Sequence, residues 1–298
     1  MSSVRVWVSA FRLRTLPLSL SCIFTGSAFI PFRPQVGWIM LLVIVTTIFL
    51  QILSNLANDY GDFQNGADTE DRVGPKRTVQ SGAISPHSMK KAMTLFAGLS
   101  FISGCGILLW LGYKLDWIYS LIFLAIGIFS IWAAIRYTSG NNPYGYRGLG
   151  DVYVFLFFGL VGVLATDFIH QLKVDLKMLF PAFAMGLIAT AVLNLNNMRD
   201  IQTDRTTGKI TIPVRLGLKR AKVYHLCLIV FAWLWIIATL IELTSHWSNW
   251  LVLIMLPIHV LHTIRVFNIQ RCEQLDPELK KIALSAFFIA LIFLISPL

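Results

Sequence analysis

Charged residues are scarce in this sequence. Asp, Glu, Lys and Arg together make up 13% of its 298 residues, about half the share that is usual in a soluble domain. The hydrophobic fraction is 56%, which is more than a soluble core of this size requires. The shortage of charge therefore excludes an ordinary soluble protein and indicates a chain whose outer surface faces lipid.

Cysteine is also rare, and its spacing carries no chemical pattern. The four cysteines lie far apart and form no CxxC pair, which excludes a zinc site and a disulfide framework. The histidines are scattered. His259 and His262 share a helix face without an evident carboxylate partner, so we expect them to pack inside the protein, and we expect Asp276 and Glu278 to be surface charges.

Acidic residues are outnumbered by basic ones, 15 to 25, which gives a net charge of +10. No nucleic-acid-binding motif accompanies this excess, so no nucleic acid partner is expected. The basic residues stand between apolar runs, as they do in cytoplasmic loops. If the N-terminus is cytoplasmic, all of them except Arg33, Lys114, Lys173 and Lys177 fall on the cytoplasmic side. The sequence thus predicts a multi-pass protein of the cell (inner) membrane whose C-terminus lies outside.

Nine apolar runs approach the length of about 20 residues that a membrane-crossing helix needs. They are roughly 14–32, 36–56, 92–112, 115–135, 151–169, 176–196, 224–243, 249–268 and 281–298. Each is predicted to be helical, because lipid cannot satisfy backbone hydrogen bonds. The fold class is therefore all-α, a polytopic membrane protein with about nine transmembrane helices in one domain over residues 1–298.

The first of two long cytoplasmic segments gathers asparagines and acids at the end of the second run. It reads Asn55-Leu-Ala-Asn58-Asp59-Tyr-Gly-Asp62 and is followed by Asp68. Asn55, Asp59 and Asp62 lie at positions i, i+4 and i+7, so they share one face of a helix.

The second segment follows the sixth run and has a similar composition. It contains Asn194, Asn196, Asn197, Asp200 and Asp204, of which Asn196, Asp200 and Asp204 again share one helix face. Acids at the ends of apolar spans cost free energy unless they are paired or coordinated. Magnesium is typically held by a few carboxylates together with phosphate oxygens. Two such segments facing each other therefore predict a magnesium site around a diphosphate.

Basic residues follow each acidic segment, and a tyrosine-rich loop lies between the two. Lys76 and Arg77, then Lys209 and Arg215, are the candidates to bind phosphate oxygens. In the loop, residues 136–151, tyrosine rings can stabilise a developing cation or pack against an aromatic acceptor. Asp151 at its end is either a helix N-cap or a group that holds the acceptor.

At these residues the chain resembles the UbiA superfamily of intramembrane prenyltransferases over essentially its whole length. The segments 55–62, 144–151 and 193–204 are most similar to the 1,4-dihydroxy-2-naphthoate polyprenyltransferase branch. The superfamily pattern places another Asp four residues after the first motif. Here Gly66 occupies that position and Asp68 follows two residues later, a spacing that resembles the naphthoate branch.

The resemblance implies a UbiA-type bundle with cytoplasmic cap loops and a magnesium-dependent reaction. A polyprenyl group passes from polyprenyl diphosphate to 1,4-dihydroxy-2-naphthoate with loss of CO2 and diphosphate, giving demethylmenaquinone. Asp59, Asp62, Asp200 and Asp204 would be catalytic, and with Asn55, Asp68 and Asn197 they would bind the diphosphate through magnesium. The other substrate-binding residues would be Asn58, Lys76, Arg77, Lys209 and Arg215 for the diphosphate, and Tyr144, Arg147 and Asp151 for the acceptor.

Two other functions stand beside this one. The same fold serves other aromatic acceptors, such as 4-hydroxybenzoate, and product analysis separates these. A divalent-cation transporter would place its acids near mid-membrane along a pathway. Here the acids lie at helix ends beside basic residues, which repel free cations and suit a diphosphate.

Overall fold

All regular structure in the described part of the chain is helical. The computed structural model describes residues 3–31, 34–67, 74 and 77–297. The all-α prediction is therefore confirmed. Its physical basis is that an α-helix satisfies nearly all its backbone groups internally, which lipid requires.

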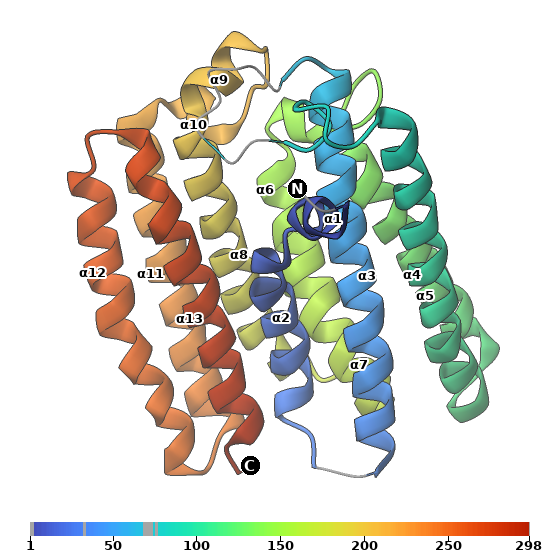
Figure 1. The fold of residues 1–298 in the computed structure, drawn as a ribbon. Coiled ribbons are helices and arrows are strands. Elements are labelled where there is room, and N and C mark those ends of the chain that lie inside the picture. The colour runs from blue at the N-terminus through green and yellow to red at the C-terminus, as the bar shows by residue number, and fades with distance from the viewer. Residues whose placement is uncertain (1–2, 32–33, 68–73, 75–76, 298) are drawn as a thin grey trace.

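The helices follow one another along the chain, and the longer connections between them include those after α3 and after α5 (Figure 1). In chain order they are α1 (Ser3–Phe11), α2 (Leu16–Ala28), α3 (Pro34–Gln64), α4 (Pro86–Lys114), α5 (Trp117–Arg136), α6 (Gly150–Val154), α7 (Thr166–Gln171), α8 (Leu179–Arg199), α9 (Ile201–Thr206), α10 (Ile212–Leu216), α11 (Leu218–Leu243), α12 (Met255–Asn268) and α13 (Asp276–Ile295). A π-helical segment, η3 (Phe155–Ala165), joins α6 to α7 without a break. Short 3-10 turns cover Leu13–Thr15, Tyr144–Arg147 (η2), Leu176–Met178, Trp247–Ile254 and Cys272–Leu275.

Seven helical segments among the described residues are long and apolar enough to cross a membrane. Each of the nine predicted runs contains a helix, but two of these helices do not qualify. Helix α2 has only 13 residues, and α13 carries charges such as Asp276, Glu278 and Lys281 in its first turns. The prediction of a polytopic helical protein is confirmed, whereas the count of about nine spans is not.

Helix α8 lies at the centre of the bundle. Two thirds (67%) of its most apolar stretch is buried, against 11% for α5. It packs against α2, η3, α11 and α13, and it presents small residues such as Ala182, Gly186 and Ala189 to them. Because α8 runs directly into the second acidic segment, the rigid core of the protein positions that segment.

The ends of α3, α5 and α8 meet in a cap that lies opposite the C-terminus (Figure 1). Gly61 on α3 touches the backbone of Thr138 so closely that an added Cβ would lie 2.5 Å from the Thr138 carbonyl carbon. Asn65 Nδ2 donates to the Thr138 carbonyl over 2.8 Å. Further along, the amide of Ile210 donates to the Tyr146 carbonyl over 3.0 Å. These contacts join the three loops that carry the candidate residues.

Two expectations about the polar residues are wrong. His262 does have a carboxylate partner, because its Nδ1 lies 2.7 Å from Glu278 Oε2. Glu278 is 4% exposed and is therefore not a surface charge. His225 Nε2 lies 2.8 Å from His262 Nε2, and Ser285 bonds His259. The partners come from α11 and α13, so spacing within α12 alone did not reveal them.

Candidate active site

A polar cavity of about 420 Å³ lies within the cap. Five segments far apart in the sequence form its walls. Its lining includes Val8, Ser9, Arg12, Leu13 and Arg14 from the N-terminal segment, Asn58, Asp59 and Asp62 from α3, Arg77 and Thr78 from the loop after α3, Tyr137 and Thr138 after α5, and Leu193, Asn196, Arg199 and Lys209 from α8 and the loop beyond it. Both acidic segments therefore contribute to one cavity, the second through Asn196 and Arg199, whereas Asp200 and Asp204 are not among its lining residues.

Asp59 is held by the loop that follows α3. Its Oδ2 accepts hydrogen bonds from the amide of Thr78 over 3.0 Å and from the Thr78 hydroxyl over 2.7 Å. Its Oδ1 accepts from the amide of Val79 over 3.3 Å. These three hydrogen bonds fix the orientation of the buried carboxylate at the edge of the cavity.

Asp62 connects the first acidic segment to the second. Arg77 Nη2 donates to its Oδ2 over 2.6 Å, and the Tyr146 hydroxyl donates to its Oδ1 over 2.8 Å. Lys209 Nζ lies 3.9 Å from Asp62 Oδ1 and 3.8 Å from Asp204 Oδ1. One ammonium group therefore faces a carboxylate from each segment, and the two segments face each other as the sequence predicted.

The second acidic segment does not lie on a single helix face. Helix α8 ends before Asp200, whose backbone leaves the helical conformation (φ −93°, ψ 11°), and Asp204 lies on α9. The amide of Asp200 still donates to the Asn196 carbonyl (3.1 Å), and that of Asp204 to the Asp200 carbonyl (2.8 Å). The i, i+4 relation thus survives the bend, but the prediction of one continuous helical face is wrong.

Arg199 holds this bend together. Its Nε and Nη2 each donate to the Asp200 carboxylate over 2.8 Å, and Nη2 also donates to Asn196 Oδ1 over 2.9 Å. Its Nη1 donates to Asp276 Oδ1 at the start of α13 over 2.6 Å. The guanidinium is almost fully buried, and Asp276 also lies 3.7 Å from Arg14. Asp276, expected to be a surface charge, is half-exposed and ties α13 to the site.

The three predicted asparagines lie in different environments, and only Asn58 lines the polar cavity. Asn55 is buried, and its Nδ2 donates to the Phe11 carbonyl over 2.9 Å and to Thr15 Oγ1 over 3.0 Å, which ties α3 to the N-terminal segment. Asn197 is buried on α8 and lies outside the lining of the cavity, where Asn196 stands instead.

Two of the predicted arginine sites lie away from the cavity. Arg147 and Arg215 are exposed on the outer surface of the cap, where Arg215 Nη2 donates to the Arg147 carbonyl over 2.6 Å. Neither lines the polar cavity. Their substrate-binding roles stay predictions.

Three further candidates complete the predicted set. Asp151 lies inside the first turn of α6, whose N-cap is Leu149, so its interpretation as an N-cap is wrong. Its Oδ2 accepts a hydrogen bond from the Tyr224 hydroxyl over 2.9 Å, and its role toward the acceptor stays a prediction. Asp68 and Lys76 lie outside the described residues.

A group of tyrosines stands between the cap and the membrane interior. The Tyr144 ring stacks on Tyr153 with centroids 3.9 Å apart and meets Tyr137 edge-on at 5.4 Å. Burial raises the pKa of Tyr137 well above its usual value, and the charges of Asp151, Asp62 and Asp204 raise it further. Tyr137 therefore stays a neutral hydroxyl beside both acidic segments.

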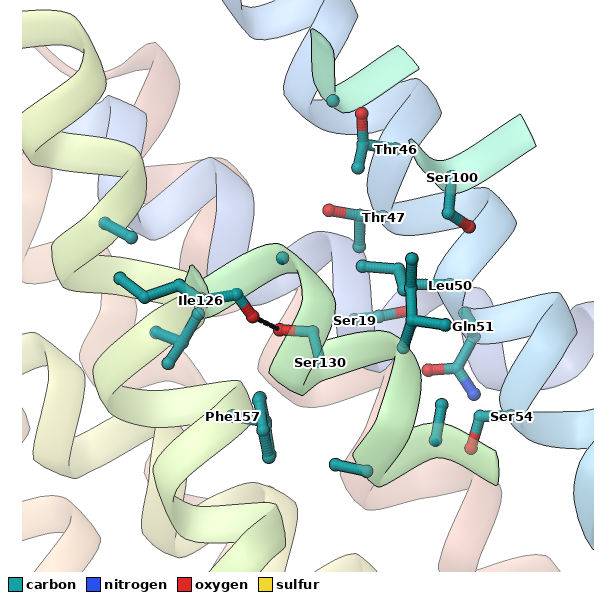
Figure 2. A pocket seen from close by; sticks show the side chains of 18 of the residues that line it. Ser19, Thr46, Thr47, Leu50, Gln51, Ser54, Ser100, Ile126, Ser130 and Phe157 are labelled. Atoms are coloured by element: carbon teal, nitrogen blue, oxygen red, sulfur yellow. Dashed lines mark hydrogen bonds between the residues drawn. The ribbon is translucent and has the colours of Figure 1, made fainter. Parts of the chain in front are cut away.

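A second, mostly apolar cavity of about 390 Å³ extends from these tyrosines into the bundle between α2, α3, α4, α5 and η3 (Figure 2). Asn58, Tyr137 and Leu193 line both cavities. A polar cavity rich in arginine therefore adjoins an apolar chamber. This combination suits an amphiphilic ligand with a charged head and an apolar tail.

The fold and site thus define a class, a helical membrane protein that handles an amphiphilic anion at one end of its bundle. The particular family follows from comparison with known proteins. The chain belongs to the UbiA prenyltransferase family, whose model matches residues 19–292. It is 42% identical to the 1,4-dihydroxy-2-naphthoate octaprenyltransferase of Haemophilus influenzae, over 97% of this chain and 94% of that protein. It is 39% identical to the Escherichia coli protein of the same name, over 99% of this chain and 95% of that protein.

Solved structures of more distant proteins have the same fold. A UbiA homolog from Aeropyrum pernix superposes with a TM-score of 0.67 at 16% identity, over 95% of this chain and 96% of that one. A UbiA homolog from Archaeoglobus fulgidus, bound to DMAPP and Mg2+, gives a TM-score of 0.60 at 15% identity, over 97% of this chain and 99% of that one. These identities show a shared architecture, and the prediction of a UbiA-type bundle is confirmed.

Several residues of the site escaped the sequence analysis. Arg12 and Arg14 come from the chain before the first span, and their basic character was assigned to membrane topology. Tyr137 and Arg199 lie within predicted segments, but no local pattern separated them from their neighbours. For Asn196 a signal did exist, because its i, i+4 spacing to Asp200 favoured it over Asn197.

Proposed function

We propose that this chain transfers a polyprenyl group from polyprenyl diphosphate to 1,4-dihydroxy-2-naphthoate, with loss of CO2 and diphosphate, in menaquinone biosynthesis. Its high identity to two proteins named for this acceptor supports the proposal, since each comparison covers almost the full length of both chains. The membrane is the proposed source of the lipid substrate, and residues 1–298 act as one domain.

The charge of the polar cavity is the observation that carries this function. Five basic side chains stand among the described lining residues, Arg12, Arg14, Arg77, Arg199 and Lys209, beside the carboxylates of Asp59 and Asp62. Arginine forks and lysine ammonium groups suit phosphate oxygens. The adjoining apolar chamber offers the matching environment for an isoprenoid chain.

The residues present also fit magnesium. Oxygen donors of Asp59, Asp62, Asn58 and Asn196 line the cavity, and oxygen is the ligand type that magnesium prefers. Asp200 and Asp204 of the second segment adjoin the cavity through their contacts with Arg199 and Lys209. Among the described residues, no group of three or more acidic, histidine or cysteine side chains is close enough to hold an ion alone. Phosphate oxygens would therefore complete the coordination. When bound, magnesium supplies charge neutralisation for the departing diphosphate.

The chain's own residues perform the remaining tasks. Lys209 and Arg77 hold the diphosphate as the C–O bond to the prenyl group breaks and the electron pair leaves with the diphosphate. The rings of Tyr144 and Tyr153 face the chamber and stabilise the allylic cation. The acceptor carbon that bears the carboxylate forms the new C–C bond, and its carboxylate departs as CO2, leaving its electron pair in the ring.

The membrane orientation completes the proposal. The cap holds most of the basic loops, and such loops favour the cytoplasm. We place the N-terminus and the cap in the cytoplasm and the C-terminus outside, in the inner membrane. The water-soluble acceptor then reaches the cap from the compartment in which it is dissolved.

The test is product formation by the purified chain in detergent with dihydroxynaphthoate, a polyprenyl diphosphate and Mg2+. We expect a decarboxylated prenyl-naphthoquinol, which oxygen in the buffer oxidises to the quinone during work-up, and we expect this product to disappear with EDTA and return when Mg2+ is restored. Product from 4-hydroxybenzoate in place of dihydroxynaphthoate would move the chain to another acceptor. Activity that persists in EDTA would contradict the magnesium requirement.

A further inference from the structure

The apolar chamber contains more hydroxyl and amide groups than an isoprenoid chain requires. Most of these groups are satisfied by their own helices. Ser100 donates to the Phe96 carbonyl over 2.7 Å, and Ser130 donates to that of Ile126 over 2.7 Å (Figure 2). Such bonds are the usual way in which a serine is accommodated inside an apolar helix, and they leave no donor for a ligand.

Three side chains on α3 differ from this pattern. Thr47, Gln51 and Ser54 line the chamber, and none of them forms a side-chain hydrogen bond with another residue that the structure describes. With Asn58 they lie at i, i+4, i+7 and i+11, which places them on one face of α3. Figure 2 shows Thr47, Gln51 and Ser54 along one side of the pocket and Phe157 on the other.

An isoprenoid tail does not account for this polar stripe. A tail offers no hydrogen-bonding partner, and an amide that is buried against it without a partner costs roughly 1–3 kcal/mol. An aromatic acceptor with ring hydroxyls and a carboxylate does offer partners. The stripe begins at Asn58, which also lines the polar cavity, and Gln51 lies about 10 Å from Asn58 along the helix axis. The stacked rings of Tyr144 and Tyr153 also line the chamber and suit an aromatic ring.

We infer that Gln51, with Ser54 and Thr47, forms the subsite that recognises the hydroxyl groups of the aromatic acceptor. This inference rests on the proposed function and adds the residues that select the acceptor. Gln51 is the specificity-determining group, because its amide both donates and accepts and therefore pairs with a phenol in either role. An acceptor that lacks the matching hydroxyl leaves the amide unpaired and binds less well.

The experiment compares Gln51→Leu and Ser54→Ala with the wild-type chain in detergent and Mg2+. The probes are dihydroxynaphthoate and two analogues that each lack one ring hydroxyl. KM is measured separately for acceptor and polyprenyl diphosphate, and acceptor binding is followed by the increase in Tm without diphosphate. Thr239→Val is the matched control, because Thr239 is buried on α11, bonds its own helix and lines neither cavity.

We expect Gln51→Leu to raise the acceptor KM about tenfold and to leave the diphosphate KM unchanged. The wild-type preference for dihydroxynaphthoate over one of the two analogues should also fall about tenfold in Gln51→Leu. A general structural defect would weaken binding of all three acceptors equally and would leave this preference unchanged. Ser54→Ala should show the same pattern to a smaller extent, and Thr239→Val should show none of it.

Two results would overturn the inference. One is an unchanged acceptor KM and an unchanged preference in both α3 variants. The other is a rise in the diphosphate KM alone, which would place the prenyl tail against the stripe. If the wild-type chain makes no product from dihydroxynaphthoate, the proposed function fails. The subsite is then tested by acceptor binding alone, measured as the increase in Tm. If dihydroxynaphthoate raises the Tm of the wild type but not that of Gln51→Leu, the subsite is supported. If it does not raise the Tm of the wild type, the subsite is refuted.

Discussion

The two acidic segments have similar residues at similar spacing, yet the structure holds them in different ways. Asp59 and Asp62 lie on the unbroken helix α3, and the loop after α3 folds back to bind them through Thr78, Val79 and Arg77. The second segment crosses a bend between two helices. Arg199, the residue before Asp200, binds the Asp200 carboxylate. Arg199 is in turn anchored to the distant helix α13 through Asp276.

The difference shows two solutions to one physical problem. Carboxylates buried at a membrane surface repel each other and need partners. The first segment obtains donors for both of its acids from the next stretch of chain, so its geometry is mostly local, and Tyr146 adds one distant donor to Asp62. The second depends on α13, which is far away in the sequence, and on Lys209, which faces both segments. Substitutions can therefore disturb one segment without the other.

Removing one carboxylate from each segment should have the largest effect. We expect Asp59→Ala and Asp200→Ala each to lower kcat by about 10²–10³-fold, a loss typical of removing one group that stabilises transition-state charge. The measurement is product formation at saturating Mg2+, with membrane insertion and Tm checked alongside. Normal turnover in either variant, in a folded protein, would contradict the magnesium-binding assignment of that segment.

Gly61→Ala should disturb the first segment alone. The added methyl group would meet the backbone of Thr138 at 2.5 Å, so α3 and the loop after α5 must separate. Overpacking of this kind costs about 1–3 kcal/mol, and we expect a lower Tm together with at least tenfold lower activity. Gly98→Ala on α4 is the matched control, because its added Cβ meets nothing within 4 Å. Equal behaviour of the two variants would show that the close contact is unimportant.

Lys209→Ala tests the link between the segments. Lys209 approaches both carboxylates inside the cavity, whereas Arg215 lies outside it. A charge-assisted hydrogen bond contributes about 1.5–3 kcal/mol, so we expect the KM for polyprenyl diphosphate to rise at least tenfold in Lys209→Ala. Arg215→Ala should change it less than threefold. A larger effect at Arg215 would show that the diphosphate lies nearer the outer surface of the cap.

Asp276→Asn should have the smallest effect and should act on the second segment. It weakens the anchor of Arg199 and leaves all groups within the cavity in place. We expect the Mg2+ concentration for half-maximal activity to rise about threefold, with kcat nearly unchanged. Glu273→Gln is the control, because Glu273 is an exposed carboxyl near the start of α13 that does not line the cavity. A fall in kcat without a change in Mg2+ dependence would contradict a positioning role.

Much of the site was predictable because its signals are local. Asp59 and Asp62 share a helix face through i, i+3 spacing, and a helix was certain in so apolar a run. Arg77 and Lys209 follow their acidic segments closely in sequence. Asn197 and Arg215 were chosen by the same reasoning and lie outside the cavity, because proximity in sequence does not say which way a side chain points at a bend or in a loop.

The sequence alone determined that this protein is a helical membrane protein, which loops carry its acids, and the family to which it belongs. Each of these follows from periodicity, composition or contiguous motifs. Only the tertiary structure decided that the N-terminal Arg12 and Arg14 enter the site and that Asp276 on α13 anchors Arg199. It also decided that Thr47, Gln51 and Ser54 on α3 face an apolar chamber with side chains that bond no other described residue. These features depend on contacts between segments distant in the chain, and such contacts arise from packing, which no local pattern encodes.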